Sequence, residues 1–334
     1  MMGKIFYTCL GTLLILISCS EELPLISGGN QSPVIYGLFN PDDSANYIRL
    51  TKSFVGLESA EVMAKDPRNL YYEQAEVRLD INSAEGYPIT SYTFQKVVLP
   101  DKLDGYFATS PNYNYVLKGP LDLLFADSFQ IRLLVRIPGE NLLLSAQQTY
   151  CSPPEFLSPR VSSQTRFSLY TSEPQRIKWV DKYGFQRYIL VFRFNYINRF
   201  EENEESESFD VSFKNESQAL SPGQKPGTLL HIFEGDDFLR RLSFGIPTNP
   251  AIINRSFVSI DILLTGLTKE YCEYEETNQI ATDRSGQPVT NIVGGMGLFA
   301  LKVKSQLKGY LLDPPSLDSL IKGRYTKKLK FVKW

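Results

Sequence analysis

From residue 34 onward, apolar and polar side chains alternate with a period of two, in short segments separated by turn residues. This period predicts half-buried strands and not amphipathic helices, because successive side chains on a strand point to opposite faces. The segments are rich in Val, Ile, Tyr and Phe, which favour pleated sheets. The predicted strands are residues 34–39, 47–54, 75–82, 92–99, 113–117, 128–137, 141–147, 175–180, 187–196, 208–213, 228–232, 256–264 and 297–303.

Strands at this spacing predict a mostly β protein with two immunoglobulin-like, β-sandwich domains in tandem. Two successive prolines at 153 and 154 cannot lie inside a strand ladder, so we place the boundary there. The first domain is then residues 34–150 and the second is residues 151–310. Residues 59–72 are the exception and indicate a short helix. The strand at 187–196 alternates less than the others, which predicts burial on both faces.

The N-terminus has the layout of a secretory signal peptide. Lys4 precedes an apolar run of about a dozen residues, which is shorter than the roughly 20 residues of a membrane-spanning helix. The run ends in Leu-Ile-Ser-Cys at residues 16–19, which resembles a bacterial lipobox. We therefore predict a signal peptide at 1–18, lipidation of Cys19 and a tether at 19–33. The alternative is an ordinary signal peptide with a chance cysteine.

Acidic residues follow the predicted lipidation site, since Ser20 is followed by Glu21 and Glu22. This pattern resembles the surface-export signal of Bacteroidota lipoproteins. We therefore expect a lipid anchor in the outer membrane, with the protein on the cell surface. A periplasm-facing protein with an arbitrary polar tether is the alternative.

Composition excludes several classes of function. The chain of 334 residues has 35 Lys+Arg against 37 Asp+Glu, so no basic excess indicates a nucleic-acid partner. It has one histidine, His231, and no His pair for zinc, no phosphate-binding Gly-rich loop and no Gly-x-Ser-x-Gly motif. We predict no metal, no cofactor, no catalytic residue and no enzymatic activity. A hydrolase that uses scattered carboxylates is the least favoured alternative.

Two cysteines, Cys151 and Cys272, remain for the folded part of the chain. An exported protein meets an oxidising compartment, so a disulfide between them is one possibility and two buried free thiols are the other. A nucleophilic pair with His231 lacks a local motif, and a packed or surface histidine is the better interpretation.

Charge is unevenly distributed along the chain. Five glutamates fall within residues 201–207, which predicts an exposed hairpin tip because like charges repel. Residues 311–334 form a predicted basic C-terminal tail in which Leu329 and Phe331 alternate with lysines. An edge strand with lysine on its solvent face is favoured over a docking tail for an acidic partner or lipid headgroups. Asp-Ser-Ala and Asp-Ser-Leu triplets resemble the Bacteroidota O-glycosylation signal and mark Ser44 and Ser319 as possible sites.

Two stretches carry a family resemblance. Residues 34–43 read Val-Ile-Tyr-Gly-Leu-Phe-Asn-Pro-Asp-Asp and precede Tyr-Ile-Arg-Leu-Thr-Lys-Ser-Phe at 47–54. Residues 291–299 read Asn-Ile-Val-Gly-Gly-Met-Gly-Leu-Phe. With the lipobox, these resemble the Bacteroidota outer-membrane lipoproteins of domain-of-unknown-function family 4249. Gly37 and the Asn-Pro-Asp turn suit a first hairpin. The later glycines suit a strand entry with positive φ or close backbone contact.

The resemblance implies a setting and no catalytic residues. Such lipoproteins tend to accompany TonB-dependent receptors, so we expect a non-enzymatic accessory subunit of a β-barrel membrane complex, in TonB-dependent uptake or outer-membrane protein biogenesis. The expected partner is an outer-membrane β-barrel protein. The alternative is a surface adhesin module that binds glycan or peptide, which 19 Tyr and 21 Phe would serve, including Tyr71 and Tyr72.

Overall fold

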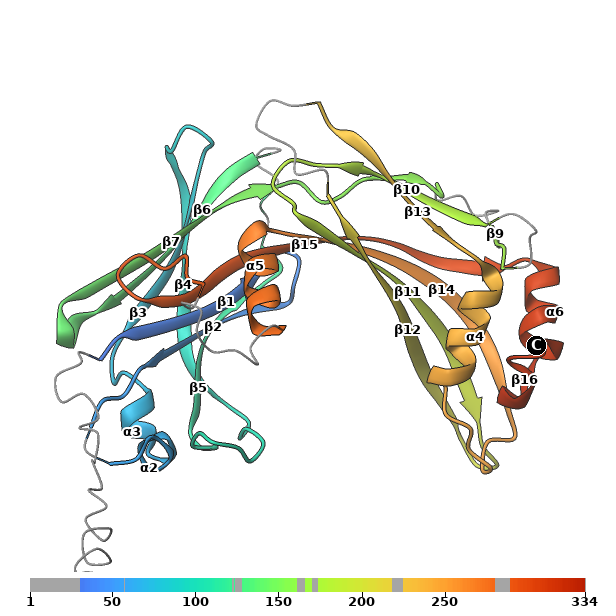
Figure 1. Ribbon diagram of the computed structural model, residues 1–334, viewed down its shortest axis with the longest axis horizontal. Helices are drawn as coiled ribbons and strands as arrows, with labels where there is room; N and C mark the ends of the chain where they lie inside the picture. Colours follow the sequence, from blue (N-terminus) through green and yellow to red (C-terminus); the bar gives the residue numbers. More distant parts are fainter. Residues whose placement is uncertain are drawn as a thin grey trace, which may run out of the picture.

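The computed structural model describes residues 31–56, 58–121, 123, 128–160, 166–169, 174–217, 225–279 and 289–333. The described chain is mostly β with large sheets, as the alternation predicts. It forms two lobes that meet at an angle, like an arch (Figure 1). No helix in these described ranges is long and apolar enough to cross a membrane.

The first lobe is a curled, sandwich-like sheet with the strand order β1-β2-β5-β4-β3-β6-β7. The curl brings β7 back to the start of β15, where Ser145 pairs with Val293. Aliphatic side chains such as Leu79 and Leu133 fill the interior. Its elements are β1 (Pro33–Phe39), β2 (Ala45–Lys52), α2 (Ala60–Lys65), α3 (Pro67–Leu70), β3 (Glu76–Asn82), β4 (Pro88–Leu99), β5 (Asn112–Lys118), β6 (Ser128–Ile137), η1 (Pro138–Glu140) and β7 (Leu142–Cys151).

The second lobe is layered. Its main sheet has the order β12-β11-β14-β15, and a smaller sheet, β13-β10-β8, packs against it together with α4. Phe192 of β11 contacts both Phe233 of β13 and Phe238 of α4, at ring-centroid distances of 4.8 and 5.9 Å. The small sheet and α4 therefore cover the same face of β11.

The elements of this lobe are β8 (Phe156–Ser158), β9 (Arg166–Phe167), β10 (Gln175–Asp181), β11 (Arg187–Arg199), β12 (Glu204–Glu216), β13 (Gly227–Phe233), α4 (Gly235–Gly245), β14 (Asn254–Leu267), α5 (Lys269–Gln279), β15 (Met296–Leu312), α6 (Pro314–Lys322), η2 (Lys327–Leu329) and β16 (Phe331–Val332). The prediction that β11 is buried on both faces is wrong. Its even-numbered side chains are buried, whereas Arg193 and Asn195 on the other face are only half-buried. Arg193 and Asn195 donate hydrogen bonds to Asp210 and Asp261, so this face mixes polar residues with half-buried aliphatic ones such as Val191.

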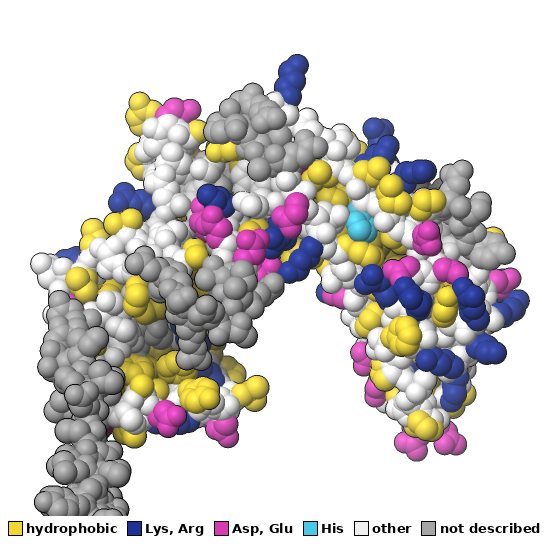
Figure 2. Space-filling view, in the orientation of Figure 1, with side chains coloured by type: hydrophobic (Ala, Val, Ile, Leu, Met, Phe, Trp, Pro, Cys, Tyr) yellow, Lys and Arg dark blue, Asp and Glu magenta, His cyan; other side chains and the backbone are white. Residues whose placement is uncertain are grey.

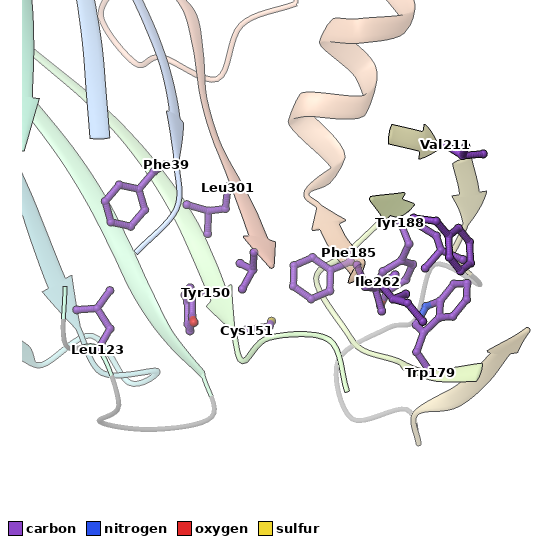
Figure 3. Close-up of a cluster of buried hydrophobic side chains, with 14 of the residues drawn as sticks. Phe39, Leu123, Tyr150, Cys151, Trp179, Phe185, Tyr188, Val211, Ile262 and Leu301 are labelled. Atoms are coloured by element: carbon purple, nitrogen blue, oxygen red, sulfur yellow. The ribbon is translucent and has the colours of Figure 1, made fainter. Parts of the chain in front are cut away.

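One strand belongs to both lobes. Residues 296–301 of β15 pair in parallel with β1, and residues 302–310 pair in antiparallel fashion with β14. The predicted second domain, 151–310, therefore contains a strand that completes the first lobe. The division into two tandem domains stays a prediction. Buried side chains run without a break from Phe39 and Leu301, past Cys151 and Phe185, into the second lobe (Figure 3).

The segment predicted as a basic tail folds onto the second lobe. α6 begins after Asp313, whose carboxylate accepts a hydrogen bond from the Ser316 backbone N–H at 2.8 Å. β16 then pairs with β14 and buries Phe331. Arg255 donates to the carbonyl oxygen of Leu329 at 2.8 Å. Lys327, Lys328, Lys330 and Lys333 are exposed on this packed segment. The predicted edge strand is only partly present, because Leu329 lies in η2 and the strand is limited to Phe331–Val332.

Candidate functional site

An aromatic groove lies on the outer face of the first lobe, with a volume of about 580 Å³. Segments distant in sequence form it: β1 and β2 with the two residues that follow β2, α3, the β4–β5 loop and α5. We call it the first-lobe groove. Its lining residues are Val34, Tyr36, Arg49, Thr51, Lys52, Ser53, Phe54, Leu70, Phe107 and Tyr274.

The floor of the groove follows from strand alternation. Ile35 and Leu50 point into the core, so Val34, Tyr36 and Arg49 must point outward from the same sheet. Tyr36 and Arg49 are paired in register across β1 and β2. The floor therefore presents an aromatic ring beside a guanidinium group.

The walls come from α5 and from the β4–β5 loop. Tyr274 of α5 lies over Tyr36, with ring centroids 5.7 Å apart. Burial raises the pKa of Tyr36, and the neighbouring Tyr274 adds to the shift, so its hydroxyl stays protonated at neutral pH. On the opposite side stands Phe107, with 52% of its surface exposed.

The described lining of the groove offers aromatic rings and cations to a ligand. Among the described residues, its ionisable lining side chains are Arg49, Lys52 and two tyrosines, and no carboxylate lines it. Aromatic faces next to cations can stack on a planar or apolar ligand surface while holding an anionic group. Elsewhere in the described ranges, no three His, Cys, Asp or Glu side chains gather as a metal site.

A second hollow, of about 370 Å³, lies where the two lobes meet. Side chains and backbone of residues 147–149, 183–186 and 268–270 line it, so both lobes and α5 contribute. Its surroundings are amides and hydroxyls with Lys269 and Glu270 at one side. We regard it as the seam of the arch, because the residues that brace the lobes lie next to it.

Arg187 is the main brace at this seam. Its side chain, only 9% exposed, forms ion pairs with Glu216 at 2.6 Å, Glu275 at 2.9 Å and Glu276 at 2.6 Å. Burial opposes the charged form, but the hydrogen bonds to Glu216 and Glu276 raise the pKa of Arg187 above its usual value. Because α5 also contacts Tyr36 through Tyr274, this helix ties β11 of one lobe to β1 of the other.

The cysteines do not form a bridge in this structure. Cys151 and Cys272 are both buried free thiols. Cys151 ends β7 and packs against Gly184, whereas Cys272 lies in α5 near Arg187. Burial raises the pKa of each thiol to about 11, so neither is a thiolate at neutral pH.

His231 is a packed histidine, as predicted. Its Nδ1 lies 2.8 Å from Asn215 Oδ1, and its ring lies 4.4 Å from that of Phe213. Burial, with the charge of Arg241, lowers the pKa of His231. The predicted acidic tip is also in place, because β11 and β12 join there and Glu204 pairs with Arg199 at 2.6 Å.

The remaining predicted sites are separate from the groove. Ser44 is exposed in the turn between β1 and β2, and Ser319 is half-buried in α6. Cys19 and its tether lie outside the described residues, as do residues 1–18. The structure therefore brings none of the predicted site residues together.

Comparison with known proteins identifies no family. No family model and no curated protein matches the chain. Among solved structures it is similar to CBD12 from CALX1.2, with 7% identity over 82% of this chain and 100% of that one, at a TM-score of 0.18. A second is the C-terminal globular domain of oligosaccharyltransferase from Pyrococcus abyssi, with 12% identity over 86% of this chain, 46% of that chain and a TM-score of 0.17. Scores this low carry no argument.

Sequence reasoning missed the first-lobe groove. The sequence shows many aromatic residues, but Tyr36, Phe107 and Tyr274, whose rings line the groove, are far apart in it. The one local signal was Tyr36 at an outward position of the first strand. Nothing in the sequence pattern places α5 against it, since that contact depends on where β15 enters the first lobe.

Proposed function

We propose that the mature chain is a non-enzymatic lipoprotein, anchored through Cys19 in the outer membrane and facing the cell surface. The observation that carries this proposal is the lipobox at residues 16–19, followed by Ser20, Glu21 and Glu22. Two acyl chains or more on one cysteine supply membrane affinity at roughly 0.8 kcal/mol per buried CH₂. The rings and cations that line the described part of the first-lobe groove support a binding role.

In that setting the chain acts as an accessory subunit of an outer-membrane β-barrel protein, for nutrient uptake or for outer-membrane protein biogenesis. The family resemblance of residues 34–54 and 291–299 supports this role. The seam supports it as well, because the Arg187 ion pairs and the shared strand β15 brace the lobes at one angle. A braced arch presents a constant surface to a partner, which lowers the entropic cost of association.

A pull-down from detergent-solubilised outer membranes tests the role, with labelled palmitate to report lipidation. We expect label on the wild-type chain and a β-barrel protein in the eluate. Cys19→Ala is the matched control and should lose the label. Recovery of a lipidated chain without any barrel protein would refute the accessory role, and protection from protease added to intact cells would refute the surface location.

A second candidate function, binding of glycan or peptide, is favoured by the first-lobe groove. Tyr36, Phe107 and Tyr274 provide ring faces, and Arg49 provides a cation for an acidic group. Glycan and peptide arrays test this. If a ligand binds, Tyr36→Ala should weaken its binding by about five- to thirtyfold, since loss of a ring contact typically costs about 1–2 kcal/mol.

Tyr87→Ala is the matched control for the binding test. Tyr87 is 72% exposed at the β3–β4 turn, away from the groove. Its loss should leave ligand affinity unchanged. Equal losses for the two variants, or no hit on either array, would refute the binding function.

A further inference from the structure

The lower end of the first lobe exposes several large apolar side chains. They come from residues 53–56, 58–72 and 100–111, which we call the apolar foot. Leu103 is 94% exposed, Tyr106 77% and Phe107 52%, all in the β4–β5 loop. Val62 of α2 is 55% exposed, and Val55, which precedes α2, is 40% exposed. Hydrophobic side chains gather at this end of the molecule in Figure 2.

The apolar foot is an ordered unit. The backbone N–H of Ala108 donates to the Ala64 carbonyl at 2.8 Å, and Lys65 Nζ donates to the carbonyl of Gly105. Leu70, Tyr71 and Ala108 form a small hydrophobic cluster of their own beneath it. The loop is therefore held against α2 and α3, while its outermost apolar side chains remain without cover from the described residues.

An exposed cluster of this kind marks a contact with a protein or a membrane. The point where the described chain enters the fold favours a membrane over a protein partner. Ser32, two residues into the described chain, exchanges hydrogen bonds with Ser53 at 2.8 Å in both directions, so the chain enters the fold beside the first residue of the foot. Cys19 precedes residue 31 by twelve residues. Fully extended, that segment spans at most about 45 Å.

We infer that the apolar foot rests on the surface of the lipid bilayer, with Leu103 and Tyr106 in the headgroup–acyl boundary. This rests on the proposed lipid anchor at Cys19, which holds the foot near the bilayer. Leucine and aromatic side chains are those that favour this boundary. Once the lipid anchor is in the bilayer, a weak contact between the foot and the bilayer costs little additional entropy, because the tether keeps the local lipid concentration high.

Charge determines the kind of contact. The described foot has five carboxylates (Glu58, Glu61, Asp66, Asp101, Asp104) against three cations (Lys65, Arg68, Lys102), a net charge of −2. Attraction to anionic lipid is therefore not the driving force. The contact should depend on apolar burial, should persist at high salt and should not strengthen as the fraction of anionic lipid rises.

Tryptophan fluorescence in vesicles tests the inference. The lipidated full-length mature protein is reconstituted into phosphatidylcholine vesicles whose acyl chains carry bromine, a contact quencher. Leu103→Trp should lose emission in brominated vesicles relative to unbrominated ones, after subtraction of the wild-type signal. The loss should persist at high salt.

Tyr87→Trp is the matched control. Tyr87 precedes β4 and Leu103 follows it, so about 40 Å of strand separates two exposed positions of the same lobe. Tyr87→Trp should show no quenching. Quenching at Tyr87→Trp as well would mean that the lobe does not contact the bilayer specifically through the foot.

The outcomes separate the inference from the proposed function. Mass spectrometry that finds no lipid on Cys19 refutes the proposed anchor. A lipidated protein in which Leu103→Trp is not quenched refutes the bilayer contact and leaves the anchor standing. A blue shift of Leu103→Trp without quenching means that protein, such as a second copy or the tether, covers the foot, and this also overturns the inference.

Discussion

The two lobes bury their apolar surface in different ways. The first lobe is a sheet curled on itself, and its interior is mostly aliphatic, with Val77, Ile131 and Val135 fully buried. The second lobe is layered, and aromatic rings lie between its sheets and α4, where Phe192 contacts both Phe233 and Phe238. The first lobe also buries some rings, such as Phe129 stacked on Tyr150, whereas in the second lobe rings from β11, β13 and α4 meet between the layers.

The lobes also differ in what completes them. The second lobe is built from consecutive chain between residues 156 and 332, whereas the first needs residues 296–301 to extend its sheet beyond β1. The first lobe can therefore be completed only after nearly all of the chain has been synthesised. The folding of the first lobe therefore depends on the second. The following predictions test how the two lobes differ, from the largest expected effect to the smallest.

The aromatic core of the second lobe should be the most sensitive to truncation. Phe192 is fully buried and contacts rings from β13 and α4. We expect Phe192→Ala to lower the free energy of unfolding by about 4 kcal/mol, through lost burial and the cavity left behind. Urea denaturation measures this. The control is Ile131→Val in the first lobe, which should lower the free energy of unfolding by about 1 kcal/mol. A smaller decrease for Phe192→Ala than for Ile131→Val would contradict the comparison.

The shared strand should be nearly as sensitive at its entry into the first lobe. Gly297 has a φ of +109°, and a Cβ there would lie 1.9 Å from the Ile35 carbonyl oxygen. Gly297→Ala should cost about 3 kcal/mol, because β1 and β15 must move apart. The control is Gly309→Ala on the same strand, with a φ of +79° and nothing within 4 Å. It should cost only about 1 kcal/mol, and equal costs would show that strand separation is unimportant.

The brace at the seam should have an intermediate effect. Arg187→Met removes three ion pairs from a nearly buried guanidinium and should cost about 2 kcal/mol. Hydrogen exchange of α5 should rise, because the helix loses its link to β11. The control is Arg193→Met, whose exposed pair with Asp210 should be worth less than about 1 kcal/mol. Unchanged exchange in α5 would mean that Arg187 does not brace the lobes.

Adjacent aspartates in the β1–β2 turn should respond to pH with opposite signs. Burial alone would raise the pKa of Asp43, but the hydrogen bond from Lys304 and the charge of Lys302 lower it. Its charged form therefore stabilises the fold above the usual aspartate pKa of about 4, and this stability is lost as the pH falls through the lower, folded-state pKa. Burial, and then the charge of Asp43, raise the pKa of Asp42, so its charge destabilises the fold at neutral pH.

Stability measured from pH 7 down to pH 2 checks this pair. At pH 7, Asp43→Asn should lower stability and Asp42→Asn should raise it, each by less than about 1 kcal/mol. Both differences should shrink at low pH, where the wild-type carboxyls are protonated. Changes of the same sign at pH 7 would contradict the assignment.

The cysteines provide the smallest effect, with no expected change in stability. Both thiols are buried with a pKa raised to about 11, so iodoacetamide at neutral pH should modify neither in the native protein and both after unfolding. Intact mass reports the number of modified thiols. An unfolded protein that resists alkylation until a reductant is added would instead establish the Cys151–Cys272 bridge.

Much of the fold could be predicted, because its signals are local. The predicted strands all lie in or overlap observed strands, and the short helix at residues 59–72 is present as α2 and α3. The helices α4, α5 and α6 were missed. α5 has a weakly amphipathic sequence, Lys-Glu-Tyr-Cys-Glu-Tyr-Glu-Glu, and is held by Arg187 and Tyr36, which are distant in sequence. α6 was hidden by Pro314 and Pro315, which stand in its first turn.

The candidate site was less predictable than the fold. Cys19 and the acidic residues after it are read from the chain directly, and no contact is needed to recognise them. The groove and the apolar foot required the folded structure, since Leu103 and Val62 are ordinary residues until the positions of their neighbours show that nothing described covers them.

By itself, the sequence determined the β class of the protein, most of its strands and the proposed membrane address, because alternation, turn residues and the lipobox act over a few neighbouring positions. It also indicated the glycine at 297, whose role is confirmed by its positive φ and its close approach to Ile35. Only the tertiary structure decided that β15 serves both lobes and that α5 closes one side of the groove. These features depend on pairings across more than two hundred residues, and no local pattern encodes which distant segments meet.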